Sequence, residues 1–278
     1  MMEKSQYARV PQEGTRNPGW RASARRAEHE QHFYARLLQQ HFRPGIRWLD
    51  AGCGHSLLQP WLPNAKEIER RFLTEADWIV GADVDAQSLS LPCSIPRVAC
   101  DLERLVFDQE TFDLITCNMV AEHLSAPQLV FREFFRVLKP GGVALILTPN
   151  LHHWTNGLAW LTPFWFHKWA LKKLGERPPE DIFPTLYRCN TPAAIHKSLS
   201  SAGFSSIAVH LVPGRPRLVD FGALFYPEYL FYRFSLRFPQ LREILCALAR
   251  KPQAADDAPA LSTQVVHRNG SQFSAQGA

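Results

Sequence analysis

An acid followed by glycines at two alternate positions, Asp50-Ala51-Gly52-Cys53-Gly54, could bind a ligand that carries charge of both signs. The apolar run before it, 46–49, is typical of a buried parallel strand that ends in a tight turn. Glycine reaches backbone conformations that other residues avoid, and it lets a ligand lie against bare main chain. The peptide N–H groups of such a turn, near the start of the next helix, favour an anionic group. The acid favours a cationic group on the same ligand.

Further apolar runs also end in polar residues. Residues 78–83 end at Asp83, which could accept hydrogen bonds from two ribose hydroxyls, and residues 97–101 end at Asp101. Residues 112–118 end at Asn118. In open α/β sheets, ligands bind outside the carboxyl ends of the strands. S-adenosylmethionine fits the pattern, because it has a ribose, a carboxylate, an ammonium and a sulfonium.

Two later motifs complete an ordered set. Glu122-His123-Leu124 follows the fourth strand, and Arg136-Val137-Leu138-Lys139-Pro140-Gly141-Gly142 closes a helix before a strand at 143–147. Over residues 45–150 the set resembles the class I S-adenosylmethionine-dependent methyltransferases, within them the small-molecule branch that includes the ubiquinone and menaquinone methyltransferases. Over 190–250 the similarity is looser. The motifs say almost nothing about the methyl acceptor.

The resemblance implies an α/β fold with a Rossmann-like seven-stranded sheet, mostly parallel with an antiparallel edge strand, and helices on both faces. It implies S-adenosylmethionine as the cofactor. Asp83 would bind the ribose, with Asp85 as the alternative, and Asp101 with Leu102 would lie beside adenine. The full set of cofactor-binding residues that it implies is Asp50, Ala51, Gly52, Cys53, Gly54, Asp83, Val84, Asp101, Leu102 and Asn118.

Two features depart from the family pattern. Ser56 stands where a third glycine is usual, and the interval from Gly54 to Asp83 is longer than usual. Pro60 and Pro63 follow the turn and predict a short or kinked first helix, because proline lacks the N–H that a helix interior needs. These departures leave the cofactor site in place but bear on its local geometry.

His123 and His153 are the candidates for a catalytic base. An imidazole can take a proton near neutral pH, which matters if the acceptor is a hydroxyl or a protonated amine. His123 follows the fourth strand, where family members hold the acceptor, but a packing or helix-start residue is the favoured interpretation. His152 and His153 follow Asn150 at the mouth of the expected site, or are ordinary loop residues. No acid or cysteine stands at metal-ligand spacing from them, so no metal site is predicted.

Composition excludes several classes of protein. The 278 residues, 46% of them hydrophobic, suffice for a large α/β domain. A net charge of +5 without a long run of cationic residues gives no indication of a nucleic-acid partner. Six cysteines without a C-x-x-C pair are typical of thiols in a reducing cytosol. There is no signal-peptide core and no apolar stretch of roughly 20 residues, so a cytoplasmic location is expected.

The chain divides into three parts. Residues 1–23 predict a flexible N-terminal arm, 24–251 the methyltransferase domain, and 252–278 a disordered tail rich in polar residues. Two inserts, 151–190 and 213–240, interleave aromatic residues with cations and are expected to form a substrate cap over the carboxyl ends of the strands. Packing within such a cap is one interpretation of the rings. Contact of a basic amphipathic helix with a membrane surface is the other.

Strand and helix patterns alternate as a parallel sheet requires. A leading helix over 24–41 is expected to pack on the sheet or to cover the cofactor, and a helix is expected over 127–138. Thr191 and Gly203 predict the two ends of a third helix over 192–202. The strands are expected at 46–50, 78–83, 97–101, 112–118, 142–148, 206–211 and 244–249.

These features predict an S-adenosylmethionine-dependent methyltransferase that acts on a small, hydrophobic or lipid-linked acceptor, with peripheral contact at the inner face of the membrane left open. A catalytically inactive cofactor-binding protein or membrane-associated scaffold of the same fold is the alternative. An NAD-dependent oxidoreductase would need a G-x-G-x-x-G turn, which the chain lacks. Asn118-Met119-Val120-Ala121 replaces the Asn/Asp-Pro-Pro-aromatic signature of amino-methylating nucleic-acid enzymes. The acceptor, the methylated atom and the oligomeric state stay open.

Overall fold

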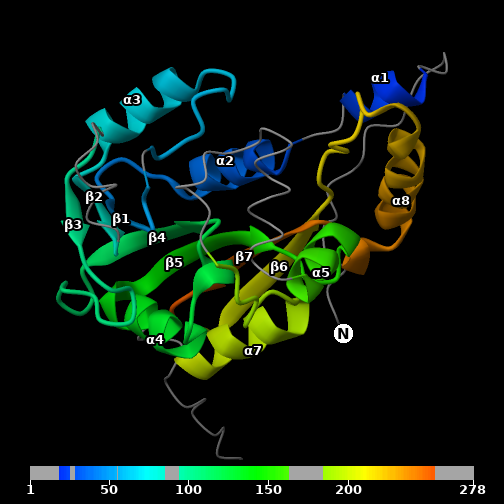
Figure 1. The fold of residues 1–278 in the computed structure, drawn as a ribbon. Coiled ribbons are helices and arrows are strands. Elements are labelled where there is room, and N and C mark those ends of the chain that lie inside the picture. The colour runs from blue at the N-terminus through cyan, green and yellow to red at the C-terminus, as the bar shows by residue number, and fades with distance from the viewer. Residues whose placement is uncertain (1–18, 26–28, 55, 85–93, 163–183, 254–278) are drawn as a thin grey trace, which may run out of the picture.

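The structure is a computed structural model that describes residues 19–25, 29–54, 56–84, 94–162 and 184–253. Its strands are Arg47–Ala51 (β1), Trp78–Asp83 (β2), Arg97–Ala99 (β3), Phe112–Asn118 (β4), Leu138–Pro149 (β5), Ser206–Val212 (β6) and Ile244–Arg250 (β7). They form one sheet in the order β3-β2-β1-β4-β5-β7-β6 (Figure 1). β1 to β5 pair in parallel, whereas β7 is antiparallel to both β5 and β6. The predicted fold class is confirmed, with the antiparallel strand one position inside the edge that β6 forms.

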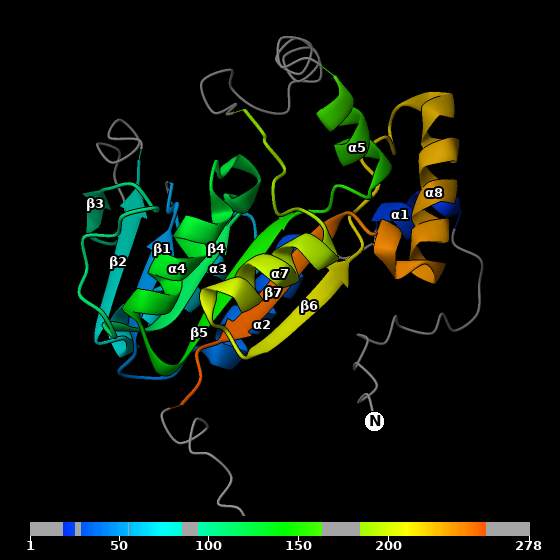
Figure 2. The same ribbon diagram turned by 90° about the horizontal axis from the view of Figure 1, so that it is seen from below.

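Helices cover both faces of the sheet. Those described are Trp20–Arg25 (α1), Glu30–His41 (α2), Ala65–Glu75 (α3), Pro127–Val137 (α4), Trp154–Leu161 (α5), Pro192–Ala202 (α7) and Phe225–Arg237 (α8), with short 3-10 turns at Ala121–His123 (η2), Gly222–Leu224 (η4) and Pro239–Leu241 (η5). α2 and α3 lie on one face, and α4 and α7 on the other (Figures 1 and 2). α8 and α1 lie beyond the end of β6, away from the central strands.

Successive residues of the central strands point to opposite faces, as the pleat of a β-strand requires. Leu49, Ile115 and Ile146 pack into the cluster that contains the inner residues of α4 and α7. Their neighbours Trp48, Leu114 and Leu145 pack into the cluster that contains the inner residues of α2 and α3. Both faces of the middle strands are therefore dry, which accounts for their almost continuous apolar sequence.

Capping signals place the ends of two helices where the sequence predicts them. Pro127 is the first residue of α4, a position at which the missing N–H costs nothing. The Thr191 side chain accepts a hydrogen bond from the Ala194 N–H at 3.2 Å, and α7 begins there. α7 ends at Gly203, whose φ of 108° is in the left-handed region that favours glycine.

The helix after the glycine turn differs from the expectation. α3 begins only at Ala65, after both Pro60 and Pro63, and runs for 11 residues. The prolines therefore precede the helix rather than kink or shorten it. Because the intervening segment is not helical, the glycine turn does not lie at a helix N-terminus, and the predicted stabilisation of an anion by that terminus is wrong.

α1 and α8 form a small satellite cluster. Ala24 of α1 is fully buried against Phe225 and Tyr229 of α8, and Trp20 stacks on Tyr229 with ring centroids 5.5 Å apart. The Arg21 guanidinium donates a hydrogen bond to the Gly222 carbonyl at 3.0 Å. The last residues of the predicted flexible arm, 1–23, are thus helical, because an apolar partner from the far end of the chain is available to them.

Parts of the sequence predictions fall on segments that the structure does not describe. Residues 1–18 of the predicted arm, 163–183 of the first insert and 254–278 of the predicted tail lie outside the described residues. Among the described residues, no helix combines the length and hydrophobicity needed to cross a membrane.

Candidate active site

The glycine turn after β1 leaves main chain bare. Gly52 has a φ of 72°, and a Cβ there would overlap the Val120 side chain. Gly54 has a φ of 48°, but a Cβ there would meet no atom within 4 Å. Gly52 is therefore required by packing, whereas Gly54 presents its backbone to open space where a ligand can lie.

Asp83 closes this turn from the neighbouring strand. Its Oδ2 accepts a hydrogen bond from the Gly54 N–H at 3.1 Å, and Arg97 Nη1 donates to the Gly54 carbonyl at 3.0 Å. The end of β2 and the glycine turn thus form one hydrogen-bonded unit at the carboxyl edge, the edge of the sheet where β1, β2, β4 and β5 end. A carboxylate beside bare main chain suits a ligand with vicinal hydroxyls, as the sequence predicts for Asp83.

Asp50 is a buried acid, with 6% of its surface exposed. Its Oδ1 accepts a hydrogen bond from Thr116 Oγ1 at 2.5 Å, and Thr116 accepts one from Trp48 Nε1 at 2.7 Å. Burial raises the pKa of Asp50 to about 7; the hydrogen bond from Thr116 opposes the rise, and the nearby Asp83 adds to it. A cation at this carboxylate would offset the cost of ionisation, so the site fits the ammonium group of S-adenosylmethionine.

Asn118 is held by the leading helix. Its amide makes two hydrogen bonds with the buried Gln31 amide of α2, at 3.1 and 3.0 Å. Tyr34, Ala35 and Leu38 of α2 are buried in the core below. The helix expected over 24–41 therefore packs on the sheet, and its first turn fixes the side chain at the end of β4.

The remaining predicted cofactor residues divide by exposure. The side chains of Ala51, Cys53 and Leu102 are buried in the core, which leaves only their backbone atoms for a ligand. Val84 is 75% exposed. Asp101 is exposed, and its carboxylate accepts the Glu103 N–H at 2.9 Å in a local turn. Asp85, the alternative ribose ligand, lies outside the described residues.

His123 lies in η2, directly after β4. Its Nδ1 is 2.8 Å from the Pro184 carbonyl oxygen. Because a carbonyl only accepts, Nδ1 carries the proton and Nε2 is free of one in the neutral ring; Nε2 is 3.8 Å from Glu122 Oε1. Glu122 is itself buried and accepts a hydrogen bond from Thr148 Oγ1 at 2.9 Å. His123 is thus anchored through Nδ1 and has Nε2 beside Glu122.

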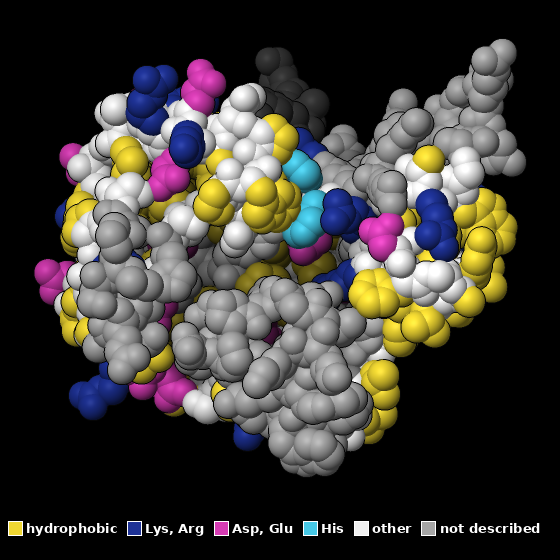
Figure 3. Space-filling view, turned by 45° about the horizontal axis from the view of Figure 1, so that its top comes forward, with side chains coloured by type: hydrophobic (Ala, Val, Ile, Leu, Met, Phe, Trp, Pro, Cys, Tyr) yellow, Lys and Arg dark blue, Asp and Glu magenta, His cyan; other side chains and the backbone are white. Residues whose placement is uncertain are grey.

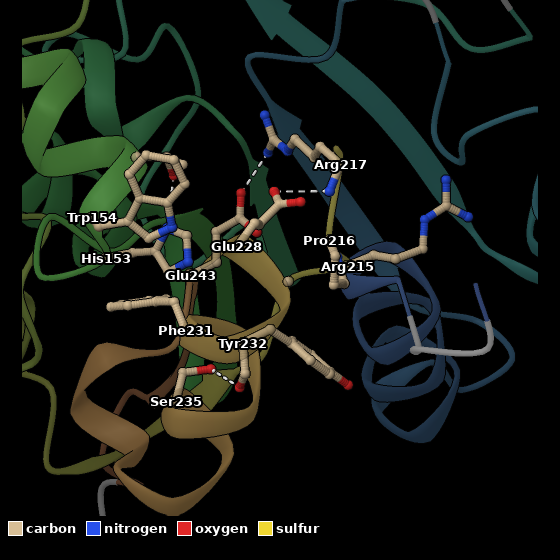
Figure 4. A pocket seen from close by; sticks show the side chains of 12 residues that line it. His153, Trp154, Arg215, Pro216, Arg217, Glu228, Phe231, Tyr232, Ser235 and Glu243 are labelled. Carbon is tan, nitrogen blue, oxygen red and sulfur yellow. Dashed lines mark hydrogen bonds and ion pairs between the residues drawn. The ribbon is translucent and has the colours of Figure 1, made fainter. Parts of the chain in front are cut away.

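His153 lies in a separate pocket lined by residues 153–155 at the start of α5, by residues 214–217 after β6, and by α8 (Figure 4). Its ring packs edge-on to Phe231 with centroids 5.2 Å apart, and its Nδ1 is 2.7 Å from Thr155 Oγ1. Burial lowers the pKa of His153 to about 4, and Arg217 adds to the shift. The imidazole is therefore neutral at physiological pH. Trp154, Phe231 and Tyr232 give the pocket aromatic walls.

Sequence inspection missed Glu243, the buried acid of this pocket. It is 5% exposed, and its Oε1 pairs with Arg217 Nη2 at 2.5 Å. Burial raises its pKa to about 7, although Arg217 opposes the rise. A Cβ at Gly214 would overlap the Glu243 carboxylate, so a larger residue there would displace that side chain. A signal could have found it, because an antiparallel strand that begins at 244 has its preceding residue at the carboxyl edge. The pairing of Ile244 with Pro149 shows that Glu243 lies there.

The family of the chain follows from comparison with known proteins. A family model described as a methyltransferase domain matches residues 24–208. The chain belongs to this methyltransferase family. The match confirms the predicted resemblance to class I S-adenosylmethionine-dependent methyltransferases and, with it, S-adenosylmethionine as the cofactor.

Individual relatives cover less of the protein. The chain is 32% identical over 120 residues to malonyl-[acyl-carrier protein] O-methyltransferase of Erwinia pyrifoliae, covering 40% of this chain and 41% of the relative. It is 32% identical over 114 residues to ubiquinone biosynthesis O-methyltransferase of Coxiella burnetii, covering 41% and 48%. The matches therefore span less than half the length of these relatives.

A solved structure extends the similarity of fold over most of the chain. The structure is the complex of the Haloferax volcanii Trm112 methyltransferase activator with a methyltransferase, and it matches 84% of this chain and 95% of that one, with a TM-score of 0.52. At 15% sequence identity, this match shows the fold alone.

Proposed function

We propose that the protein transfers the methyl group of S-adenosylmethionine to a small hydrophobic or lipid-linked acceptor. The observation that carries the proposal is the bare main chain at Gly54 between two carboxylates, Asp83 at the turn and the buried Asp50, whose raised pKa calls for a cation. The pocket around His153 has aromatic residues beside charged ones, and its aromatic part agrees with a hydrophobic acceptor. The names of two relatives, a malonyl-[acyl-carrier protein] O-methyltransferase and a ubiquinone biosynthesis O-methyltransferase, agree with it.

In this mechanism the protein has little covalent work to do. S-adenosylmethionine supplies a methyl group already activated by its sulfonium. Asp50 would hold the ammonium and Asp83 the ribose hydroxyls, which would fix the position of the donor. The chain must then hold the acceptor atom in line and exclude water, a contribution on the order of 7–11 kcal/mol in favourable cases.

His123 and His153 are the two residues that we propose to take the proton of a hydroxyl acceptor. In the neutral ring of His123 the proton is on Nδ1, which donates to the Pro184 carbonyl, so the basic lone pair is on Nε2. His153 stays unprotonated at neutral pH because burial lowers its pKa. We propose both histidines as candidates for this base.

The experiment is calorimetric titration of the purified protein with S-adenosylmethionine and with its demethylated product. Micromolar binding of both is expected, and Asp50→Asn should weaken it. Transfer of a labelled methyl group is then screened over quinol, acyl-carrier and lipid-linked hydroxyl acceptors. With the acceptor found, His153→Gln should lower kcat by about 100-fold and leave cofactor affinity unchanged. Folded protein that binds neither ligand would refute the proposal, and binding without transfer to any acceptor would favour a scaffold.

A further inference from the structure

The outer face of α8 is apolar and in contact with solvent. Tyr226, Leu230 and Phe234 recur every fourth residue, so they lie on one side of the helix. They are 50%, 66% and 50% exposed. Phe238 continues the row at 37%, and its ring contacts that of Phe234 with centroids 4.3 Å apart.

The apolar surface continues beyond the helix. Leu224 is 61% exposed and Phe221 48%, and both belong to the turn that leads into α8. Trp20 of α1, 51% exposed, stacks on Tyr229 beside them. We call this set the α8 surface. Figure 3 shows hydrophobic side chains gathered on that side of the molecule. On most protein surfaces exposed apolar residues are isolated, so a gathered set calls for an explanation.

Cations are interleaved with these rings. Arg233 and Arg237 are exposed on the same face of α8. Within the part of the chain that the structure describes, neither forms an ion pair with a carboxylate. The only acid of α8, Glu228, is engaged elsewhere, because its carboxylate accepts the Arg217 and Leu218 N–H groups at 2.9 and 2.7 Å. The α8 surface is therefore aromatic and positively charged.

We propose that the α8 surface docks the protein on a bilayer that contains anionic lipids. Aromatic rings with arginines are the composition that suits the interface between headgroups and acyl chains. A second copy of the chain is the other occupant to consider. A two-fold dimer would place the same positive patch against itself, whereas an anionic bilayer complements it.

The opposite face of α8 connects this surface with the pocket. Phe231, Tyr232 and Ser235 of α8 line the pocket that contains His153 and Glu243 (Figure 4). One helix thus faces solvent with its outer residues and the pocket with its inner ones. If the acceptor is lipid-linked, a point that rests on the proposed function, α8 would bring its reactive end from the bilayer to the pocket.

The test is co-sedimentation of the full chain with vesicles of phosphatidylcholine alone and of phosphatidylcholine with an equal part of phosphatidylglycerol. Binding is expected to be at least about tenfold tighter to the anionic vesicles. The double variant Arg233→Gln/Arg237→Gln should bind the anionic vesicles more weakly, by about fivefold for each arginine replaced. Leu230→Asp/Phe234→Asp should abolish binding to both. Leu129→Asp, an exposed leucine of α4 at 43%, is the matched control and should bind like the wild type.

Calorimetric binding of S-adenosylmethionine is measured on the same variants and should not change, which separates docking from the cofactor site. Vesicle binding without any methyl transfer would leave docking intact and refute only the proposed function. A wild type that ignores anionic vesicles, or a Leu230→Asp/Phe234→Asp variant that still binds them, would overturn the inference. So would sedimentation velocity showing a wild-type dimer that this variant dissociates, because the surface would then belong to a second copy.

Discussion

Replacing Asp50 by asparagine should make the ligand-free protein more stable above neutral pH. The side chain keeps its shape and can still accept the Thr116 hydroxyl, but the buried charge is gone. In the wild type, the carboxyl pKa rises from 3.8 in the unfolded chain to about 7 in the folded one. The folded state therefore holds this proton more firmly than the unfolded chain does. The stability that this group contributes is fully present below the unfolded pKa of 3.8 and is lost as the pH rises through the folded pKa of about 7.

The size of the effect follows from the shift. At about 1.4 kcal/mol per pKa unit, the shift costs the wild type about 4 kcal/mol above neutral pH. Roughly 2 kcal/mol of that loss falls between about pH 5.5 and pH 8. The gain in free energy of unfolding of Asp50→Asn over wild type should be larger at pH 8 than at pH 5.5 by this amount.

The assay is urea unfolding without cofactor, followed by tryptophan fluorescence at both pH values. Asp101→Asn, which removes an exposed carboxylate near the same edge, is the control for the loss of a charge outside the core. S-adenosylmethionine should bind Asp50→Asn at least about 30-fold more weakly, because the ammonium loses a buried partner. Equal stability differences at the two pH values would refute the buried-charge argument, and unchanged affinity would refute its link to the cofactor.

Four further variants have distinct expected outcomes. Gly52→Ala should lower the free energy of unfolding, measured in urea, by about 2–4 kcal/mol, because its Cβ would overlap the Val120 side chain. Gly54→Ala should lower it by only about 1–2 kcal/mol, because a Cβ there meets no atom. Gly54→Ala should still weaken cofactor binding in calorimetry. Thr116→Val should cost about 1–3 kcal/mol in the same unfolding assay, because it leaves a buried indole N–H and carboxyl without their shared partner. Burial lowers the pKa of His153 to about 4, so the folded protein binds this proton less firmly than the unfolded chain does. The stability that this group contributes is therefore fully present above about pH 6.5 and falls by up to about 3 kcal/mol as the pH is lowered. His153→Gln should remove this part of the pH profile.

The sequence alone determined the order of the helices and strands and the edge of the sheet at which a ligand is expected. Apolar runs ending in Asp50, Asp83 and Asn118 predicted three strands within a residue of their observed ends, because burial on both faces leaves a continuous apolar signal. Thr191 and Gly203 gave the ends of α7 because capping depends on local chemistry. The family match then confirmed the motifs as a set.

Only the tertiary structure decided which side chains serve the site. Leu102 carries a motif position yet lies in the core, and Glu243 carries none yet is buried beside His153. The charge state of Asp50 likewise follows from the side chains that exclude water around it. Local sequence patterns indicate the backbone conformation that a segment prefers and which of its faces is apolar. Burial, pKa values and pockets depend on residues that are distant in sequence and meet only when the sheet forms.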